Sequence, residues 1–427
     1  MLFYNINKKS PKVNLEEGLM RGLAPDGGLY FPDKFPQFSN KELKGLIGKT
    51  IQEIGYEVFK KWFASEIGDE DLKEIAEKAL NFPIPLKEVG PFKILEVFHG
   101  PTFAFKDIAA RCLAQMMSYF LQKRSRVATV LVATSGDTGG ACAQGFAGVK
   151  NVRLVVLFPK RRVSKLQTEQ MSRVAENVVP VEVDGVFDDC QALVKKAFVD
   201  PELRPLNLTS SNSINIGRLI PQTIYYIYAY SQLPKDNLEF IVPSGNMGNV
   251  TAGLFAYKMG LPFNSFIIAT NENDAAVHYY KTGEFKPQET VRTISTAMDV
   301  GNPSNFIRVL ELFGHDWTKF KEIIKAVRID TATTIATIKE VRTKYNYLLD
   351  PHTAVGFAAA KRIASSNRIP VIIATASPLK FASEIKKTTG IDVDDRRVMD
   401  RLLKRKQRKY ELENNYEKFK KFLLNLP

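Results

Sequence analysis

Five short apolar runs, rich in β-branched residues, constrain the fold of this chain more than any other feature of its sequence. Helical patterns separate them, and continuous apolar runs that alternate with helices are typical of parallel strands covered on both faces. We therefore predict an α/β fold, in which ligands bind beyond the carboxyl ends of the strands. The runs are Val127–Ala133, Val152–Phe158, Leu238–Val242, Phe266–Thr270 and Pro370–Thr375.

The length of the chain predicts more than one domain. At 427 residues it exceeds the size of an ordinary domain, so we expect two or three. Residues 1–95 differ from the rest, because the turn residues of APDGGLYFPDKFP are followed by helical patterns without the strand-like runs.

Composition argues against several classes of protein. No apolar run approaches the ~20 residues that cross a membrane, and the first residues, MLFYNINKKS, lack the apolar core of a secretory signal. Three cysteines without CxxC spacing argue against a disulfide framework, and four scattered histidines argue against a metal site. With 44% hydrophobic and 25% charged residues, the chain has the composition expected of a globular protein of the cytoplasm.

The net charge of +14 raises the question of nucleic-acid binding. Such binding requires basic residues that cluster on one face, whereas here Lys and Arg are spread along the chain. Residues 396–421 are locally basic, but they mix Glu with Lys and carry spaced Leu and Phe, which predicts an amphipathic terminal helix. We expect a small anionic substrate, no nucleic acid, and a monomer or homodimer.

A lysine stands inside the apolar stretch FHGPTFAFKD. Burying an unpaired ammonium is costly, so a lysine in this setting either extends its head to the surface or has an altered pKa or a chemical partner. Lys106 is therefore a candidate for an amine that forms a Schiff base with a carbonyl.

Three loops at predicted strand ends have the residues that bind anions. In SGNMGN, residues 244–249, glycines let backbone N–H groups converge before a helix, so the loop is either a phosphate site or a tight turn. In TSGDTGG, residues 134–140, hydroxyls and backbone donors suit a carboxylate, or else a side chain only caps the helix. In ATASP, residues 374–378, one hydroxyl faces the expected crevice.

Together these motifs resemble the threonine synthases, which are members of the tryptophan-synthase-β-like (fold type II) family of pyridoxal-phosphate enzymes. The resemblance extends over nearly the whole chain, and the order PTFAFKD, TSGDTG, SGNMGN is highly specific. The matching segments are GLAPDGGLYFP, HGPTFAFKD, ATSGDTGGA, SSNSINIGRL, VPSGNMGN, ATNEND, DPHTAVG and ATASPLKF.

The resemblance implies parallel sheets flanked by helices in a large and a small domain, with an N-terminal extension. We expect the N-terminal domain to span residues 1–95 and the small α/β domain, with the cofactor lysine and TSGDTG, to span 96–210. Residues 211–427 are expected to form the large α/β domain, with SGNMGN and the C-terminal helix.

It also implies a cofactor and the residues that hold it. Lys106 would carry pyridoxal 5'-phosphate covalently, and Thr375 would meet the nitrogen of its pyridine ring. A neutral hydroxyl in that place means that the ring need not be protonated. The cofactor phosphate would lie on the backbone of the SGNMGN loop, formed by Gly245, Asn246, Met247, Gly248 and Asn249.

The implied reaction converts O-phospho-L-homoserine and water into L-threonine and phosphate, with Lys106 as base and acid in turn. Asn212 and Arg218 would face the substrate phosphate, for which a guanidinium is well matched. The TSGDTG loop would bind the substrate carboxylate through Thr134, Ser135, Asp137 and Thr138.

The chain departs from the family pattern in a few places. Ser377 stands where family members often have a histidine, which puts the contribution of that histidine in doubt here. His352 lies in DPHTAVG, where Asp350 and Pro351 already form a helix start, so we interpret it as structural. His99 is near Lys106 in sequence, and the sequence assigns it no role.

Two alternative functions remain at this stage. A related phospho-lyase would use the same fold and release 2-oxobutyrate, because a fold does not determine a reaction. Asn212 and Arg218 argue for a phosphorylated substrate and against a simple serine or threonine dehydratase. The second alternative, a basic nucleic-acid-binding protein, would have no physical need for Lys106, and a visible absorption band would distinguish it from an enzyme.

Overall fold

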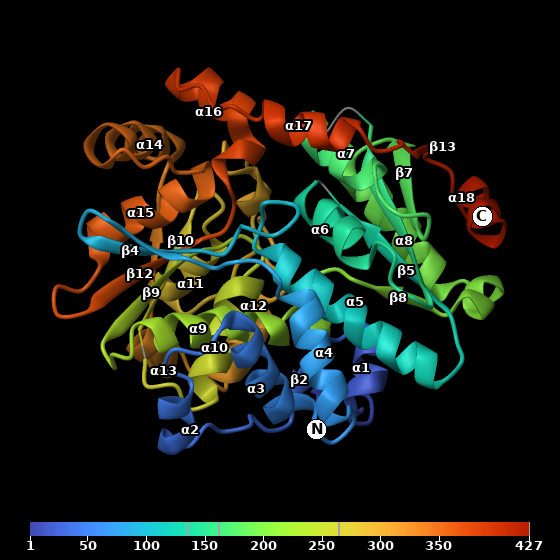
Figure 1. Ribbon diagram of the computed structural model, residues 1–427, viewed down its shortest axis with the longest axis horizontal. Helices are drawn as coiled ribbons and strands as arrows, with labels where there is room; N and C mark the ends of the chain where they lie inside the picture. Colours follow the sequence, from blue (N-terminus) through green and yellow to red (C-terminus); the bar gives the residue numbers. More distant parts are fainter. Residues whose placement is uncertain (135, 161–162, 264, 427) are drawn as a thin grey trace.

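The computed structural model describes residues 1–134, 136–160, 163–263 and 265–426. Within these ranges the longer strands form two sheets, which stand side by side in Figure 1. In the six-stranded sheet, neighbouring strands are parallel except for the edge pair β3 and β4. Its strands, in order across the sheet, are β11 (Ile324–Arg328), β10 (Phe266–Thr270), β9 (Leu238–Pro243), β12 (Ile369–Ala374), β4 (Phe92–Glu96) and β3 (Leu86–Val89).

The second sheet has five strands in the described residues, all parallel to their neighbours. Their order is β13 (Tyr410–Glu413), β7 (Val178–Asp184), β6 (Val152–Pro159), β5 (Ala128–Ala133) and β8 (Leu208–Ser210). A short antiparallel pair, β1 (Phe3–Asn5) and β2 (Tyr30–Pro32), lies apart from both sheets. The α/β fold predicted from the five apolar runs is confirmed, and each run coincides with one of these strands to within one residue at either end.

Helices flank both sheets, and four of them, α1 to α4, lie in the N-terminal region. The α-helices are α1 (Leu15–Arg21), α2 (Asn40–Gly45), α3 (Ile51–Phe63), α4 (Asp69–Ala79), α5 (Lys106–Lys123), α6 (Asp137–Phe146), α7 (Lys165–Ser172), α8 (Phe187–Val199), α9 (Thr223–Gln232), α10 (Gly248–Lys258), α11 (Ala275–Thr282), α12 (Phe306–Leu312), α13 (Trp317–Ile323), α14 (Thr331–Tyr345), α15 (Pro351–Ile363), α16 (Ala382–Thr389), α17 (Arg396–Leu403) and α18 (Tyr416–Leu424). Short 3₁₀ helices are η1 (Pro201–Leu206), η2 (Ile216–Arg218), η3 (Ile220–Gln222), η4 (Thr296–Met298) and η5 (Pro378–Phe381).

Both faces of the parallel strands are buried, which explains their continuous apolar sequences. In β5, Val130 and Val132 belong to the core cluster that includes α5 and α6. Their neighbour Leu131 points to the opposite face, where it joins a cluster with α8 and α18. Successive side chains of a strand point to opposite faces, so a strand covered on both sides needs apolar residues at every position.

The N-terminal segment packs through aromatic side chains against the helix that follows β9. Phe31 of β2 and Trp62 of α3 both contact the ring of Phe255 in α10, with ring centroids 5.6 and 6.3 Å apart. Helix α3 begins with a capping box, in which Thr50 and Glu53 each bond the other's backbone N–H. Trp62 thus joins α3 to α10, while the helix packs mainly against α4 and α9.

The sheets do not follow the three segments expected from the sequence. β3, from the end of the expected N-terminal segment, and β4, which crosses its boundary, complete the sheet of β9, β10 and β12. At the other end of the chain, β13 pairs with β7, and Phe419 of α18 packs in the core beneath that same sheet. Strand edges far apart in sequence are paired to complete each sheet, and local composition does not encode such pairing.

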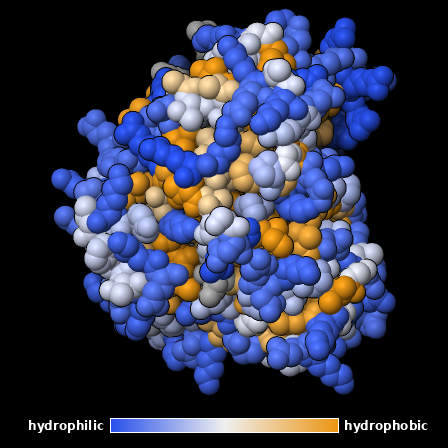
Figure 2. Space-filling view, turned by 90° about the vertical axis from the view of Figure 1, so that its left-hand side faces the viewer, coloured by the Kyte–Doolittle hydropathy of each residue, from blue (hydrophilic) through white to orange (hydrophobic). Residues whose placement is uncertain are grey.

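The surface carries mainly hydrophilic side chains on the face drawn in Figure 2, with smaller hydrophobic areas between them. Among the described residues, no helix has both the length and the apolar composition needed to span a membrane.

Candidate functional site

The segment that carries Lys106 is hydrogen-bonded to the segment that follows β12. Phe105 N–H donates to the Thr375 carbonyl at 2.9 Å, and Ser377 N–H donates to the Phe103 carbonyl at 3.0 Å. An antiparallel bridge joins Ala104 and Ala376 between them. Lys106, the first residue of α5, and Thr375, the first residue after β12, are thereby held at the same edge of the six-stranded sheet.

Asp107 fixes the turn before Lys106. Its carboxylate accepts hydrogen bonds from the backbone N–H of Thr102, at 2.8 Å, and from the Thr102 hydroxyl, at 2.5 Å. Burial raises the pKa of Asp107 to about 6, although these hydrogen bonds oppose the change. The FKD motif thus combines a reactive lysine with an aspartate that shapes its loop.

Lys106 is half-buried and lies among charged groups. Its Nζ is 3.8 Å from Oδ2 of Asp137, at the start of α6. Burial lowers the pKa of Lys106; the negative charge of Asp137 opposes this, and the positive charges of Lys380 and Arg218 reinforce it. These surroundings favour a neutral amine, which can act as a nucleophile or a base.

Asp137 itself is held by a second lysine. Nζ of Lys380, in η5, lies 2.6 Å from Oδ1 of Asp137, and Gln167 Nε2 donates to the same oxygen at 2.8 Å. Burial alone would raise the pKa of Asp137, but Lys380 and Lys106 hold that pKa far below its usual range. Asp137 is therefore ionised; it is the counter-charge of Lys380 and lies beside the amine of Lys106.

The loop between β9 and α10 places two glycines in different surroundings. A Cβ on Gly245 would lie 2.7 Å from the Cα of Met298 and 2.9 Å from the Ala297 carbonyl oxygen, so packing excludes a side chain there. Next to Gly248, the nearest side-chain atoms would be 3.6 and 3.9 Å from such a Cβ. Met247 adopts the left-handed conformation (φ 61°) between them, and α10 begins at Gly248. The result is a helix N-terminus with space beside it, which is suited to an anion.

The side chains of two asparagines in this loop differ in their hydrogen bonds. Asn246 donates to the Ser213 hydroxyl at 2.6 Å and accepts from Ser304 N–H at 2.6 Å, so it links the loop to two neighbouring segments. The carbonyl oxygen of the Asn249 side chain accepts from the hydroxyls of Tyr225 and Tyr226, at 2.6 and 2.7 Å. Within the described part of the chain, its Nδ2 is buried and has no partner.

The loop between β5 and α6 is closed by a threonine hydroxyl. Oγ1 of Thr134 accepts from the N–H groups of Gly136 and Gly139, both at 2.9 Å, so Thr134 caps the start of α6. Thr138 is half-buried in the first turn of that helix. The predicted site residue Ser135 lies outside the described residues.

Arg218 is buried and Asn212 is half-buried, and both are only partly hydrogen-bonded. Arg218 Nη1 donates to the Ser211 carbonyl and to Sγ of Cys142, and no partner of its Nε is found in the described ranges. Asn212 Nδ2 donates weakly to the Ala133 carbonyl, at 3.4 Å, while its Oδ1 is likewise unpartnered there. An unpartnered donor on a buried guanidinium near Lys106 indicates a place for an anion.

The comparisons with known proteins agree with this geometry. The family model described as "Pyridoxal-phosphate dependent enzyme" matches residues 92–374. Models described as "Threonine synthase N terminus" and "Threonine synthase, C-terminal" match residues 3–80 and 353–423. A threonine synthase from Buchnera aphidicola subsp. Baizongia pistaciae is 37% identical, over 99% of this chain and 100% of its own length. The chain belongs to the threonine synthases.

Solved threonine synthase structures have the same fold over the whole chain. The crystal structure of the pyridoxal-phosphate-bound threonine synthase from Brucella melitensis superimposes with a TM-score of 0.94 at 35% identity, covering 99% of this chain and 98% of the other. The Escherichia coli threonine synthase gives 0.91 at 36% identity, with full coverage of both chains. The predicted fold type and cofactor class are confirmed.

The residues of this threonine synthase family member fit pyridoxal phosphate. Lys106 offers an amine with a lowered pKa, and Gly248, where even a Cβ would meet only ordinary van der Waals contacts, begins a helix whose N-terminus can receive a phosphate. The buried Thr375 follows directly on β12, at the edge where Lys106 is held.

Sequence reasoning missed the charged partner Lys380. It stands between Leu379 and Phe381 in the family segment ATASPLKF, so the signal that singled out Lys106, a lysine among apolar residues, was present here too. Its side chain is fully buried. Gln167 gave no comparable signal, because a glutamine at a helix start is common in sequences.

The residues that depart from the family pattern, or lack an assigned role, have structural partners. Ser377 caps η5 by accepting from Leu379 N–H at 3.3 Å. His352 is buried between Asp350, 2.7 Å from its Nδ1, and Ala297, whose N–H donates to its Nε2 at 3.1 Å. His99 Nε2 lies 2.7 Å from Glu96, and its ring stacks on Phe98.

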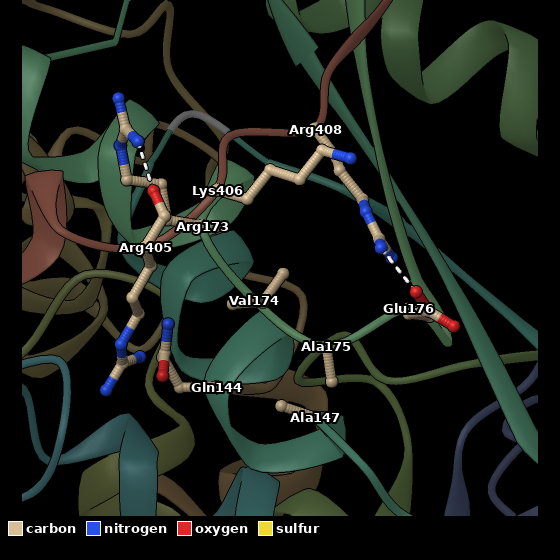
Figure 3. Close-up of a pocket in the computed structure, with 9 residues that line it drawn as sticks. All are labelled: Gln144, Ala147, Arg173, Val174, Ala175, Glu176, Arg405, Lys406 and Arg408. Atoms are coloured by element: carbon tan, nitrogen blue, oxygen red, sulfur yellow. Dashed lines mark hydrogen bonds and ion pairs between the residues drawn. The ribbon is translucent and has the colours of Figure 1, made fainter.

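A pocket elsewhere on the surface contains none of these residues (Figure 3). It has a volume of about 390 Å³ and lies between the C-terminal end of α6, the loop after α7 and the segment 405–408. Several of its basic side chains are already neutralised or hydrogen-bonded. Arg408 pairs with Glu176, and Arg173 pairs with Glu169 and donates to the Arg405 carbonyl.

Proposed function

We propose that this protein converts O-phospho-L-homoserine and water into L-threonine and phosphate. The observation that carries the proposal is the half-buried Lys106, whose lowered pKa favours a neutral amine beside the Asp137–Lys380 pair and Arg218. Arg218 has a guanidinium nitrogen without a partner in the described residues. The site therefore combines Lys106, an amine that can transfer protons at the carbon atoms of a substrate amino acid, with Arg218, which can bind a phosphate.

We assign the cofactor to the edge shared by Lys106 and Thr375. Lys106 holds it covalently, Thr375 faces the ring nitrogen, and the loop from Gly245 to Asn249 binds the phosphate through backbone N–H groups at the start of α10. In this arrangement the Asn246 side chain positions the loop, since its amide is occupied by Ser213 and Ser304.

The substrate then occupies the space between the Lys106 amine and the two anion-binding segments. Arg218 and Asn212, which have unused hydrogen-bonding atoms, bind the substrate phosphate. Ser135 and Thr138 bind the carboxylate at the start of α6, and Thr134 holds that loop in shape. Asp137 acts through its negative charge on Lys106 and Lys380. Its ion pair with Lys380 also holds the loop before α6 against η5.

When bound, pyridoxal phosphate supplies an electron sink for negative charge that develops on the substrate carbons. Lys106 Nζ removes the proton from Cα and then transfers one from Cβ, acting as base and acid in turn. Arg218 stabilises the charge that grows on the phosphate as it leaves Cγ. Cγ gains the proton taken from Cβ and becomes a methyl group, water adds its OH at Cβ and releases its other proton, and Lys106 returns a proton to Cα.

Incubation of the purified protein with O-phospho-L-homoserine tests this proposal. We expect threonine and phosphate in equal amounts, and no product with Lys106→Ala. Release of phosphate with 2-oxobutyrate in place of threonine would instead identify the related phospho-lyase. Phosphate release by neither route would overturn the assignment of the substrate.

We further propose that the enzyme acts in the cytoplasm as a monomer or homodimer. The basis is its composition, with 25% charged residues. Sedimentation of the purified protein measures the oligomeric state, and fractionation of cells measures the compartment.

A further inference from the structure

Asn305, immediately before α12, has a buried amide group that is only half satisfied. The residue is fully buried, and its Oδ1 accepts from Arg308 Nη1 at 2.6 Å. A guanidinium has donors and no acceptor, so the end of the amide that faces Arg308 must be the oxygen. The NH₂ end therefore faces the other way, where no partner is found among the described residues.

The unpartnered nitrogen faces the N-terminus of α10. Asn305 Nδ2 lies 3.6 Å from the position that a Cβ would take on Gly248, the first of the 11 residues of this helix. It is the nearest side-chain atom to that position, and the next, on Leu219, is 3.9 Å away. A buried donor thus lies beside a helix end whose own N–H groups also favour an anion.

Neighbouring hydrogen bonds hold Asn305 in this orientation. Arg308 is itself fully buried and donates to the carbonyls of Tyr30, at 2.9 and 3.1 Å, and Ile214, at 2.8 Å. On the other side, the N–H of Ser304 donates to the side chain of Asn246 within the glycine loop. The amide is therefore fixed before any ligand arrives, which lowers the entropic cost of binding.

We propose that Asn305 is a phosphate ligand, whose Nδ2 donates to an oxygen of the cofactor phosphate beside the backbone of Gly248. This inference rests on the proposed placement of the cofactor on the loop from Gly245 to Asn249. A phosphate has three terminal oxygens, so it can accept from the helix N-terminus and from a side-chain amide together. A buried NH₂ group without an acceptor is otherwise unfavourable, and the phosphate removes that penalty.

The test compares pyridoxal phosphate with pyridoxal, which lacks the phosphate. Cofactor-free full-length protein is titrated with each compound, and binding is followed by absorbance and by tryptophan fluorescence. We expect Asn305→Ala to weaken pyridoxal phosphate binding by about tenfold or more, and to change pyridoxal binding by less than about twofold. Asn305→Asp, of nearly the same shape, should weaken phosphate-dependent binding further, because its carboxylate repels the phosphate.

Asn273→Ala is the matched control, because Asn273 is also a buried asparagine but has its amide satisfied within the protein. Its Nδ2 donates to Asn271 and Val291, and its Oδ1 accepts from Val291 N–H. This change should lower thermal stability without altering the ratio of the two affinities. Circular dichroism establishes that each variant is folded, and Asn305→Asp serves if Asn305→Ala is not.

The outcomes separate this inference from the proposed function. If the wild-type protein binds both compounds equally, the placement of the cofactor phosphate is wrong. If the wild type prefers pyridoxal phosphate and the Asn305 variants keep that preference in full, the placement stands and Asn305 is not a ligand. Equal losses for both compounds would show that Asn305 is only structural.

Discussion

Lys380 Nζ lies 2.6 Å from one oxygen of Asp137, and Lys106 Nζ lies 3.8 Å from the other. One carboxylate therefore lies beside two lysines, of which Lys380 is buried and Lys106 half-buried, and the guanidinium of Arg218 is also close enough to act on Lys106. Positive charge exceeds negative charge around Lys106, and burial adds to the cost of charging its amine. The site thus favours an uncharged Lys106 and attracts an anionic substrate.

The first prediction is that Lys380 controls the protonation of Lys106. Removal of its charge in Lys380→Met leaves Asp137 free to pair with Lys106, so the pKa of the Lys106 amine rises. The acidic limb of the pH profile of kcat should move to higher pH. If that limb moves by about one pH unit, activity at a pH on the limb falls by about tenfold, because that much less of the amine is uncharged.

The control for this prediction is Lys386→Met. Lys386 is an exposed lysine of α16 that pairs with Asp392 at 2.8 Å. Its replacement should leave the pH profile unchanged. A profile for Lys380→Met with an unmoved acidic limb, even at reduced activity, would mean that Lys380 only supports the fold.

The second prediction concerns the covalent attachment at Lys106. Borohydride reduction of the loaded protein, followed by peptide mass mapping, should place the pyridoxyl group on Lys106. Lys106→Ala should lose turnover by about a thousandfold or more, because it removes both the anchor and the acid–base group. Its thermal stability without cofactor should remain near that of the wild type. Labelling of another lysine would refute the assignment.

The third prediction is that the two glycines of the β9–α10 loop have different roles, one in stability and one in cofactor binding. Gly245→Ala should destabilise the fold by about 1–3 kcal/mol, since its Cβ would meet the Cα of Met298 at 2.7 Å. Gly248→Val should instead fill the space at the helix N-terminus and weaken cofactor retention. Denaturant unfolding of the cofactor-free protein and titration with pyridoxal phosphate measure the two effects. A Gly248→Val protein with full cofactor occupancy and weakened substrate binding would reverse the assignment of the loops.

The fourth prediction is that Arg218 acts on the substrate rather than on the cofactor. Arg218→Ala should keep the visible absorption of the bound cofactor but lose about a hundredfold or more in kcat/KM for O-phospho-L-homoserine. Arg218→Lys should recover only part of this loss, because a point charge does not reproduce the planar fork of a guanidinium. Arg396→Ala, at an exposed arginine paired with Asp394, is the control. Near-normal kinetics in Arg218→Ala would place the substrate phosphate elsewhere.

The fifth prediction is that His352 supports the fold. His352→Ala should reduce the free energy of unfolding by about 2–4 kcal/mol, because it opens a cavity and leaves the Ala297 N–H and the Asp350 carboxylate short of partners. His315→Ala, at an exposed histidine, should change stability by less than about 0.5 kcal/mol. Denaturant unfolding measures both. A His352→Ala protein of unchanged stability with abolished turnover would instead make His352 catalytic.

Prediction from sequence succeeded best for features encoded by consecutive residues. The run Phe266–Thr270 is strand β10 without any shift, and Val127–Ala133 begins one residue before β5. The strands that were not predicted include β4, whose sequence FKILE mixes polar and apolar residues, and β13, which has only four residues and is largely exposed. Both strands exist because a partner strand from a distant segment lies beside them.

The same distinction applies to the site. The sequence by itself determined that Lys106 stands in an apolar run and that Gly-rich loops end the strands, because apolar spacing and backbone freedom are properties of neighbouring residues. Only the tertiary structure decided that Lys380 pairs with Asp137, and that Asn305 turns its NH₂ group to Gly248. Those contacts join segments from different strands and helices. Their energies depend on burial and on distances of a few ångströms, which are defined only once the chain is folded.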